Sequence, residues 1–284
     1  MLKRKVEKDI QNWLQDDKRA LLVYGVRQAG KTYIIRHCLE SEGCSYIEFN
    51  LIREPDIIKI LESAADIDDL ILKLSLYSEK RIVPGETILF FDEIQRYKEI
   101  VTRIKFLVED QRYRYILSGS LLGVEIVNLK SAPVGYLKTL QMYPLDFEEF
   151  LWATKNDGLM PIISKCFSEK KPLGQAMHRK VMDIFRQYLI VGGMPQAVNE
   201  YVATKDFEKV DQVKRDILTL YRADIVKYAK SYERKVESIF DEIPSQLQKL
   251  EKKFNLASIS KEARFREYED AMFWLSDAMI SNIC

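Results

Sequence analysis

The sequence predicts an α/β fold, in which a parallel sheet is covered by helices on both faces, followed by an all-helical second half. Up to about residue 145, short apolar runs alternate with stretches of helical periodicity, as in parallel strands joined by helical crossovers. Residues 146–201 carry helical patterns and no convincing strand. The 284 residues include only 11 Gly and 8 Pro, which favours long helices, because strand-dense sandwiches need many turn residues.

Composition excludes several classes of protein. Apolar residues make up 47% of the chain and charged residues 31%, as in globular proteins and unlike disordered ones. Lys and Arg number 44 against 43 Asp and Glu, so no overall field attracts nucleic acid or an anionic membrane. No apolar run approaches the roughly 18 residues of a membrane span, and the charged N-terminus is unlike a signal peptide.

The cysteines fit a reduced, cytoplasmic protein. No metal-ligand spacing occurs among them, and the chain has only two histidines, which disfavours a zinc site. We therefore expect free thiols, a cytoplasmic location and no membrane partner. The cysteines are Cys38, Cys44, Cys166 and Cys284.

Four strands and three helices are expected in the first half. The run at residues 20–24 is short, apolar and followed by glycine, and residues 87–91 are almost wholly apolar, as in strands covered on both faces. Two further strands are expected at residues 45–50 and 113–117. Apolar residues at three- and four-residue spacing predict helices over residues 5–18, 32–40 and 56–80.

The second half is predicted to contain helices alone. One helix begins near Phe147, and another over residues 181–191 ends at Gly192 and Gly193, a pair suited to a helix stop. A long amphipathic helix is expected over residues 206–230. The tail is predicted to form three short helices, at about residues 232–241, 244–251 and 261–277.

A phosphate-binding loop is the strongest functional signal. Residues 25–32, Gly-Val-Arg-Gln-Ala-Gly-Lys-Thr, match G-x-x-x-x-G-K-[ST] at every fixed position, between an apolar strand and a predicted helix. Glycines let the backbone wrap a phosphate, and N–H groups at the helix start attract its charge. Lys31 would neutralise the β- and γ-phosphates, and Thr32 would offer its hydroxyl to Mg²⁺. The candidate nucleotide-binding residues are Gly25, Val26, Arg27, Gln28, Ala29, Gly30, Lys31, Thr32 and Tyr33.

Two carboxylates follow the apolar strand at residues 87–91. Because the carboxyl ends of parallel strands meet at one edge of a sheet, Asp92 and Glu93 are expected beside the phosphate loop. We predict that Asp92 and Thr32 hold Mg²⁺ and that Glu93 polarises the attacking water. The alternative for Glu93 is a solvated carboxylate at a strand end. The strand at 45–50 separates the two motifs in sequence, which favours the P-loop branch with a catalytic glutamate over kinases and GTPases.

A third polar group ends the fourth strand, in Ile-Leu-Ser-Gly-Ser at residues 116–120. If this strand lies between the two motif strands, Ser118 points at the γ-phosphate and the water, and would sense the nucleotide. Ser120 is the alternative sensor, and a simple serine-glycine turn is the competing interpretation. Ser118 joins Lys31 and Glu93 as the predicted catalytic residues.

With these motifs, the chain resembles the prokaryotic AAA-type ATPases of the AAA+ superfamily that carry a C-terminal domain of unknown function. The resemblance implies ATP as the nucleotide and a P-loop NTPase core with a three-layer parallel sheet. It implies a core at residues 1–145, an all-α lid at 146–230 and a partial winged-helix-like segment at 231–284. The matching segments are residues 25–32, 90–95, 116–120, 142–151, 188–198, 240–247 and 274–278.

Two features depart from this resemblance. Relatives continue into a domain similar to restriction-type nucleases, so the chain looks like a C-terminally truncated member. Relatives also often have a Gly-Arg pair near the end of the core, where this chain has Gly135 and Tyr136. The arginine of that pair would act as an arginine finger, which neutralises transition-state charge. Other arginines of this chain are candidates for that role, and the alternative for each is an ordinary surface or salt-bridge arginine. The candidate substitutes are Arg103, Arg112, Arg114 and Arg222.

Three functions are compatible with these features. The leading prediction is Mg²⁺-dependent ATP binding and hydrolysis, coupled to movement of the helical lid. The alternative is a nucleotide-gated module that contacts DNA or a protein through the C-terminal segment, with little or no hydrolysis. Residues 205–284 carry 15 basic and 15 acidic residues, so this segment has no net basic footprint for DNA. The third is a degenerate interaction protein. Relatives form rings, dimers or monomers, which leaves the oligomeric state open.

Overall fold

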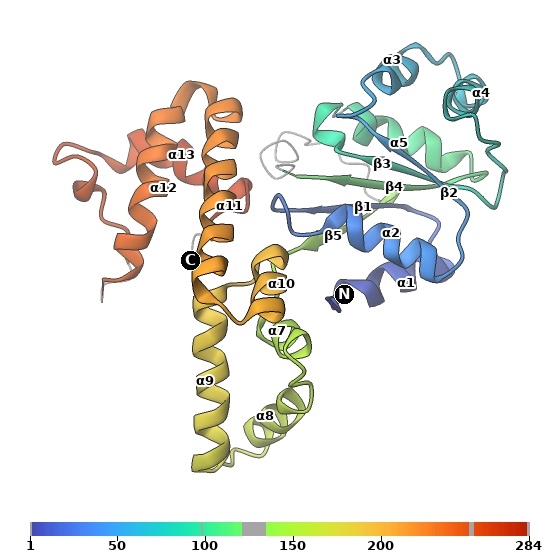
Figure 1. Ribbon diagram of the computed structural model, residues 1–284. Helices are drawn as coiled ribbons and strands as arrows, with labels where there is room; N and C mark the ends of the chain where they lie inside the picture. The colour runs from blue at the N-terminus through green and yellow to red at the C-terminus, as the bar shows by residue number, and fades with distance from the viewer. Residues whose placement is uncertain (1, 98, 121–134, 250–252, 283–284) are drawn as a thin grey trace.

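The first half of the molecule is a five-stranded parallel sheet with helices on both faces, and the second half is helical (Figure 1). The computed structural model describes residues 2–97, 99–120, 135–249 and 253–282. The strand order is β2-β3-β4-β1-β5, so β4 lies between β1 and β3, as the prediction for Ser118 required. The strands are β1 (Ala20–Gly25), β2 (Tyr46–Asn50), β3 (Ile88–Asp92), β4 (Arg114–Gly119) and β5 (Leu137–Met142).

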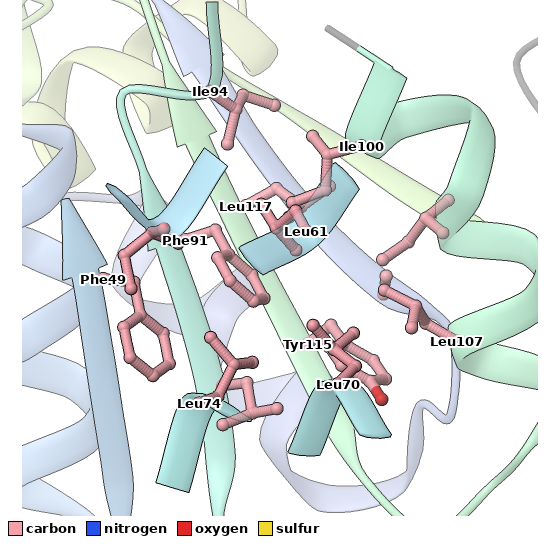
Figure 2. Close-up of a cluster of buried hydrophobic side chains, with 14 of the residues drawn as sticks. Phe49, Leu61, Leu70, Leu74, Phe91, Ile94, Ile100, Leu107, Tyr115 and Leu117 are labelled. Carbon is pink, nitrogen blue, oxygen red and sulfur yellow. The ribbon is translucent and has the colours of Figure 1, made fainter. Parts of the chain in front are cut away.

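Side chains alternate along the strands and so divide the sheet between two apolar cores. On one face, Phe49, Phe91 and Leu117 pack under α3, α4 and α5 (Figure 2). On the other face, Phe90 and Ile116 pack against α1 and α2. This arrangement confirms the predicted three-layer α/β fold. The helices are α1 (Val6–Asp16), α2 (Lys31–Ser41), α3 (Asp56–Ser63), α4 (Ile67–Ser78) and α5 (Glu99–Glu109), with the 3-10 helix η1 (Ile94–Arg96) after β3.

The second half packs around two further apolar cores. Phe150, Val198 and Val210 belong to one, which joins α7, α9, α10 and α11, while Trp274 and Leu275 belong to the other, which joins α11, α12 and α13. No helix among the described residues is long and apolar enough to cross a membrane. The elements are α7 (Phe147–Ala153), α8 (Leu159–Ser168), α9 (Gln175–Val191), α10 (Pro195–Thr204), α11 (Phe207–Tyr228), η2 (Lys230–Tyr232), α12 (Glu233–Leu247), η3 (Leu256–Ser258) and α13 (Phe265–Asp277).

Several elements differ from the sequence-based prediction, including α5, which was not expected. Strand β5 was not predicted, because it lies at the sheet edge and only Met142 of its six residues is buried. The helix expected over 56–80 is split, since Ala64 is extended and Asp66 caps α4 by accepting a hydrogen bond from the Asp69 N–H. Helix α12 continues through Pro244, which lies in its last turn and interrupts one backbone hydrogen bond. The end of the helix predicted at 244–251 lies outside the described residues.

Candidate nucleotide-binding site

The predicted phosphate loop joins β1 to α2. Gly25 ends β1, where a Cβ atom would lie 2.0 Å from the backbone oxygen of Met142, so only glycine fits beside β5. Gln28 and Gly30 have left-handed φ angles of 64° and 91°. Helix α2 begins at Lys31, directly after this turn, and the N–H groups of its first turn have no helical partner. The loop therefore presents free N–H donors at the positive end of a helix dipole, which suits an anion.

Lys31 is folded back onto the loop. Its Nζ donates to the backbone oxygens of Gly25, at 3.1 Å, and Val26, at 2.8 Å, and the residue is only 8% exposed. Burial lowers the pKa of Lys31 to about 8, although the charges of Glu93 and Asp92 act to raise it. Among the described residues this ammonium group donates to neutral carbonyls, and it would gain from contact with a phosphate, because hydrogen bonds between two charged groups are stronger.

Three side chains from separate elements converge on the carboxylate of Asp92 at the end of β3. Thr32 Oγ1 and Asn50 Nδ2 donate to Oδ2 over 2.9 Å and 3.1 Å, and Ser118 Oγ donates to Oδ1. Asp92 is 3% exposed, so these donors compensate a buried charge. The cluster assembles two predicted metal ligands, Thr32 and Asp92, with the predicted sensor Ser118.

The oxygens of Thr32 and Asp92 fit Mg²⁺. This ion prefers hard oxygen ligands, and it commonly takes one or two from the protein and the others from phosphates and water. Within the described residues, no group of three His, Cys, Asp or Glu side chains forms a separate metal cluster. The predicted ligand pair therefore agrees with the way Mg²⁺ is bound at nucleotide sites.

Glu93 follows Asp92 and is held by a neighbouring amide. Its backbone is left-handed, with φ of 60°, and its Oε2 accepts a hydrogen bond from Nε2 of Gln95. The same Nε2 lies 3.4 Å from Ser120 Oγ, which places the alternative sensor next to Glu93 rather than next to Asp92. Gln95 Oε1 is buried and has no hydrogen-bond partner in the described part of the chain. Gln95 thus fixes Glu93 while retaining an unused acceptor.

Three residues with contacts at the site were not predicted from the sequence. Asn50 and Gln95 contact the two carboxylates, as described above. Arg4, which is 7% exposed, donates to the backbone oxygens of Ala29 at 3.1 Å and Tyr143 at 2.6 Å. Arg4 also forms an ion pair with Glu149 of α7, at 3.1 Å. The N-terminal segment therefore fastens the loop to the end of β5 and to the helical half.

Other predicted residues lie outside the polar cluster. Val26 and Ala29 are buried and Tyr33 is 58% exposed, while Arg27 forms an ion pair with Asp224 of α11. All four candidate arginine fingers are engaged elsewhere. Arg103 donates to the Leu61 oxygen, Arg112 pairs with Asp110 and Asp68, Arg114 bonds to backbone oxygens at the end of α1, and Arg222 pairs with Asp241.

Comparisons with known proteins agree with this geometry. A family model described as an AAA domain matches residues 17–151, and a domain of unknown function, DUF8612, matches residues 182–284. No curated protein matches the chain significantly. A solved Walker-type ATPase of Pyrococcus abyssi has a TM-score of 0.55 and 15% identity, over 98% of this chain and 90% of that chain.

Two further solved structures are more distant. The ORC1 protein of Aeropyrum pernix in complex with DNA has a TM-score of 0.37 and 14% identity, over 98% of this chain and 82% of that chain. Drosophila ORC bound to DNA has a TM-score of 0.39 and 13% identity, over 98% of this chain and 81% of that chain. The strand order, the loop and the two family matches agree with one another. Residues 17–151 are therefore similar to the AAA domains of P-loop ATPases, and residues 182–284 are similar to a domain of unknown function.

Proposed function

We propose that the chain binds ATP with Mg²⁺ at residues 25–33 and hydrolyses it. The observation that carries the proposal is the convergence of Thr32, Asn50 and Ser118 on the buried carboxylate of Asp92, beside Lys31 and Glu93. A buried carboxylate with hydroxyl and amide neighbours, next to free helix N–H groups, suits a metal-bound triphosphate. The loop reads phosphates alone, and the choice of ATP over GTP rests on the family.

The chain's own residues would share the work of binding. The N–H groups at the start of α2 and the Lys31 ammonium would neutralise the phosphates, with Lys31 leaving the carbonyl oxygens of Gly25 and Val26. Thr32 and Asp92 would hold Mg²⁺, which when bound supplies further charge neutralisation on the β- and γ-phosphates. Asn50 and Ser118 would keep Asp92 oriented by donating to its two oxygens.

Glu93 would act as the general base. Its carboxylate accepts the proton of a water molecule as the water oxygen bonds to the γ-phosphorus, while the bond from that phosphorus to the bridging oxygen breaks and ADP leaves. Gln95 would orient Glu93 through the hydrogen bond to Oε2. Ser120, directly after β4, would steady Gln95 by accepting a hydrogen bond from its amide, so Ser118 and Ser120 would serve the two carboxylates separately.

The proposed domain division is a core at residues 1–145 and a helical lid at residues 146–230. Contacts around the phosphate loop support coupling between nucleotide binding in the core and movement of this lid. A Cβ on Gly30 would lie 3.9 Å from Pro195, so the start of α10 borders the loop. A Cβ on Gly193 would lie 2.2 Å from the backbone oxygen of Leu145, and Leu145 N–H donates to the Gly193 oxygen at 2.6 Å. The turn before α10 is thereby fixed between the phosphate loop and the end of the core.

The C-terminal segment supports an alternative in which nucleotide binding gates contact with a protein. We propose that residues 231–284 are winged-helix-like, and α12, η3 and α13 supply the helical part of such a unit. Leu247, Phe265 and Phe273 are 80%, 58% and 51% exposed, and apolar side chains of this size suit a protein partner better than DNA. We place this function in the cytoplasm, and the free thiols of Cys38, Cys44 and Cys166 support a reducing compartment.

Calorimetric titration with Mg-ATP and Mg-GTP, followed by single-turnover hydrolysis of labelled ATP, tests the proposal. The unmodified chain should bind ATP and release phosphate, whereas Lys31→Ala should lose binding. Lys59→Ala serves as a control, because Lys59 is a surface lysine of α3 paired with Asp56 and should leave binding intact. Binding without phosphate release would favour the gated interaction module, and no binding at millimolar nucleotide would refute both functions.

A further inference from the structure

An ion pair joins the phosphate loop to α11. Nη1 of Arg27 donates to Oδ1 of Asp224 across 2.5 Å, although the residues are 197 positions apart. One turn earlier on α11, Tyr221 donates its hydroxyl to the backbone oxygen of Arg27 at 3.2 Å. Figure 1 shows α11 standing between the sheet and the unit formed by α12 and α13. Helix α11 thus contacts the loop directly and carries the C-terminal helices on its other side.

Asp224 depends on Arg27 for its charge balance. The Asp224 side chain is only 4% exposed, and its Oδ2 is buried with no hydrogen-bond partner among the described residues. Arg27 is also its only cationic partner within residues 2–97, 99–120, 135–249 and 253–282. A buried carboxylate is costly unless it is paired, so the position of α11 against the loop is stable only while the guanidinium stays there.

Arg27 also belongs to the nucleotide site. Burial is the main cause of the lowered pKa of Lys31, and the charge of Arg27 adds to it. The hydrogen bond to Asp224 is the main cause of the raised pKa of Arg27, and the charge of Glu93 adds to that, so Arg27 interacts electrostatically with both groups of the site. The Arg27 side chain is 45% exposed and lies in the loop that would surround the phosphates. Guanidinium groups bind phosphates through paired hydrogen bonds, and a triphosphate offers more negative charge than one carboxylate.

We propose that Asp224 restrains Arg27 through this ion pair, and that a triphosphate in the loop competes with Asp224 for the guanidinium. The inference rests on the proposed nucleotide binding. When Arg27 turns to the phosphates, Asp224 loses its counter-ion inside the protein, and α11 must shift until water reaches the carboxylate. Nucleotide occupancy is thereby transmitted to the C-terminal domain. By linkage, nucleotide weakens the binding of any partner that holds α11 against the loop. That partner weakens the binding of nucleotide by the same factor.

Calorimetry on a double-mutant cycle tests the competition. Asp224→Asn keeps the shape of the side chain but removes its charge, so Arg27 is released and the affinity for Mg-ATP should rise about tenfold. In an Arg27→Gln background the same change should alter the affinity by less than about twofold. Asp241→Asn is the matched control, because Asp241 pairs with Arg222 between α11 and α12 at 2.7 Å and should leave the affinity unchanged.

Hydrogen exchange on the unmodified chain gives a readout that does not depend on how a variant folds. Addition of a non-hydrolysable Mg-ATP analogue should speed the exchange of α11 amides around residues 221–228. Equal or weaker affinity of Asp224→Asn, or unchanged exchange in α11 at saturating analogue, overturns the competition while nucleotide binding stands. An unmodified chain that binds no nucleotide removes the proposed function itself, and the competition with it.

Discussion

Asn50 lies directly opposite Asp92 in the register of β2 and β3, and its Nδ2 donates to Asp92 Oδ2 across 3.1 Å. The Oδ1 atom of the same amide accepts hydrogen bonds from the backbone N–H groups of Ile52 and Arg53, so the orientation of the amide is fixed. One donor therefore always faces the buried carboxylate. In this position Asn50 satisfies one oxygen of the buried Asp92 carboxylate beside the phosphate loop.

Replacing that donor with a second carboxylate should make folding depend on Mg²⁺. In Asn50→Asp, two negative charges would lie about 3 Å apart in a buried site, at a cost of roughly 2–4 kcal/mol in the free energy of unfolding at pH 7. Millimolar Mg²⁺ should restore much of this loss by binding between the carboxylates. Urea unfolding with and without Mg²⁺ measures both effects. Asn199→Asp, at an exposed position of α10, should show neither, and equal behaviour of the two variants would contradict the buried arrangement.

Glu93→Gln should separate binding from hydrolysis. The amide cannot take a proton from water, so kcat should fall by about 10²–10⁴-fold, while the dissociation constant for Mg-ATP should change little. Single-turnover phosphate release and calorimetry measure the two quantities. Glu86→Gln, at an exposed position before β3, is the matched control for loss of one carboxylate. Hydrolysis by Glu93→Gln at the parental rate would assign the base to another group.

Nucleotide affinity should fall above pH 8 because of Lys31. Burial holds the pKa of Lys31 at about 8, and contact with phosphates would favour the charged form and raise this pKa. Above pH 8 the complex then holds one more proton than the free protein, so the association constant should decrease by up to about tenfold per pH unit. Below pH 8 this group contributes no pH dependence.

Calorimetry between pH 7.5 and about pH 9.5, at constant ionic strength, measures the slope that follows from this linkage. Lys31→Arg is the informative variant, because a guanidinium stays charged throughout this range and should remove the slope even if the affinity is lower. A constant affinity for the unmodified chain across the range would show that Lys31 remains charged before nucleotide binds.

The sequence was sufficient for the parts of the fold with strong local signals. Strands β1 and β3 are buried on both faces, so their continuous apolar runs could be recognised as strands. In edge strand β5, apolar and polar residues do not alternate regularly enough for this. The break between α3 and α4 was missed, because an apolar helical period continues across it and only the Asp66 cap marks it. Residues 56–80 therefore read as one helix.

In the candidate site, too, the residues with a strong local sequence signal were predicted and the others were missed. Lys31, Thr32 and Asp92 belong to motifs whose spacing encodes their chemistry, and the parallel sheet brings them together. Asn50 could have been found by aligning the carboxyl ends of neighbouring strands, since it is the last residue of β2 as Asp92 is of β3. Arg4 and Asp224 have no local signal, because their roles arise only where segments more than 100 residues apart pack together.

Removing Arg4 should both destabilise the molecule and loosen the loop. Arg4 is the ion-pair partner of Glu149, which is 4% exposed, so Arg4→Ala leaves the buried carboxylate with backbone N–H donors but without its cation, at a cost of about 3 kcal/mol in the free energy of unfolding. Adding Glu149→Gln removes that charge and should recover part of the stability, though the Ala29 and Tyr143 oxygens still lack their donor. Urea unfolding of the two single variants and the double variant measures the coupling. As a control, Lys59→Ala removes a surface ion pair on α3 and should leave the urea midpoint unchanged. If the losses of stability in the Arg4 and Glu149 variants were additive in the double variant, the two residues would not act as a unit.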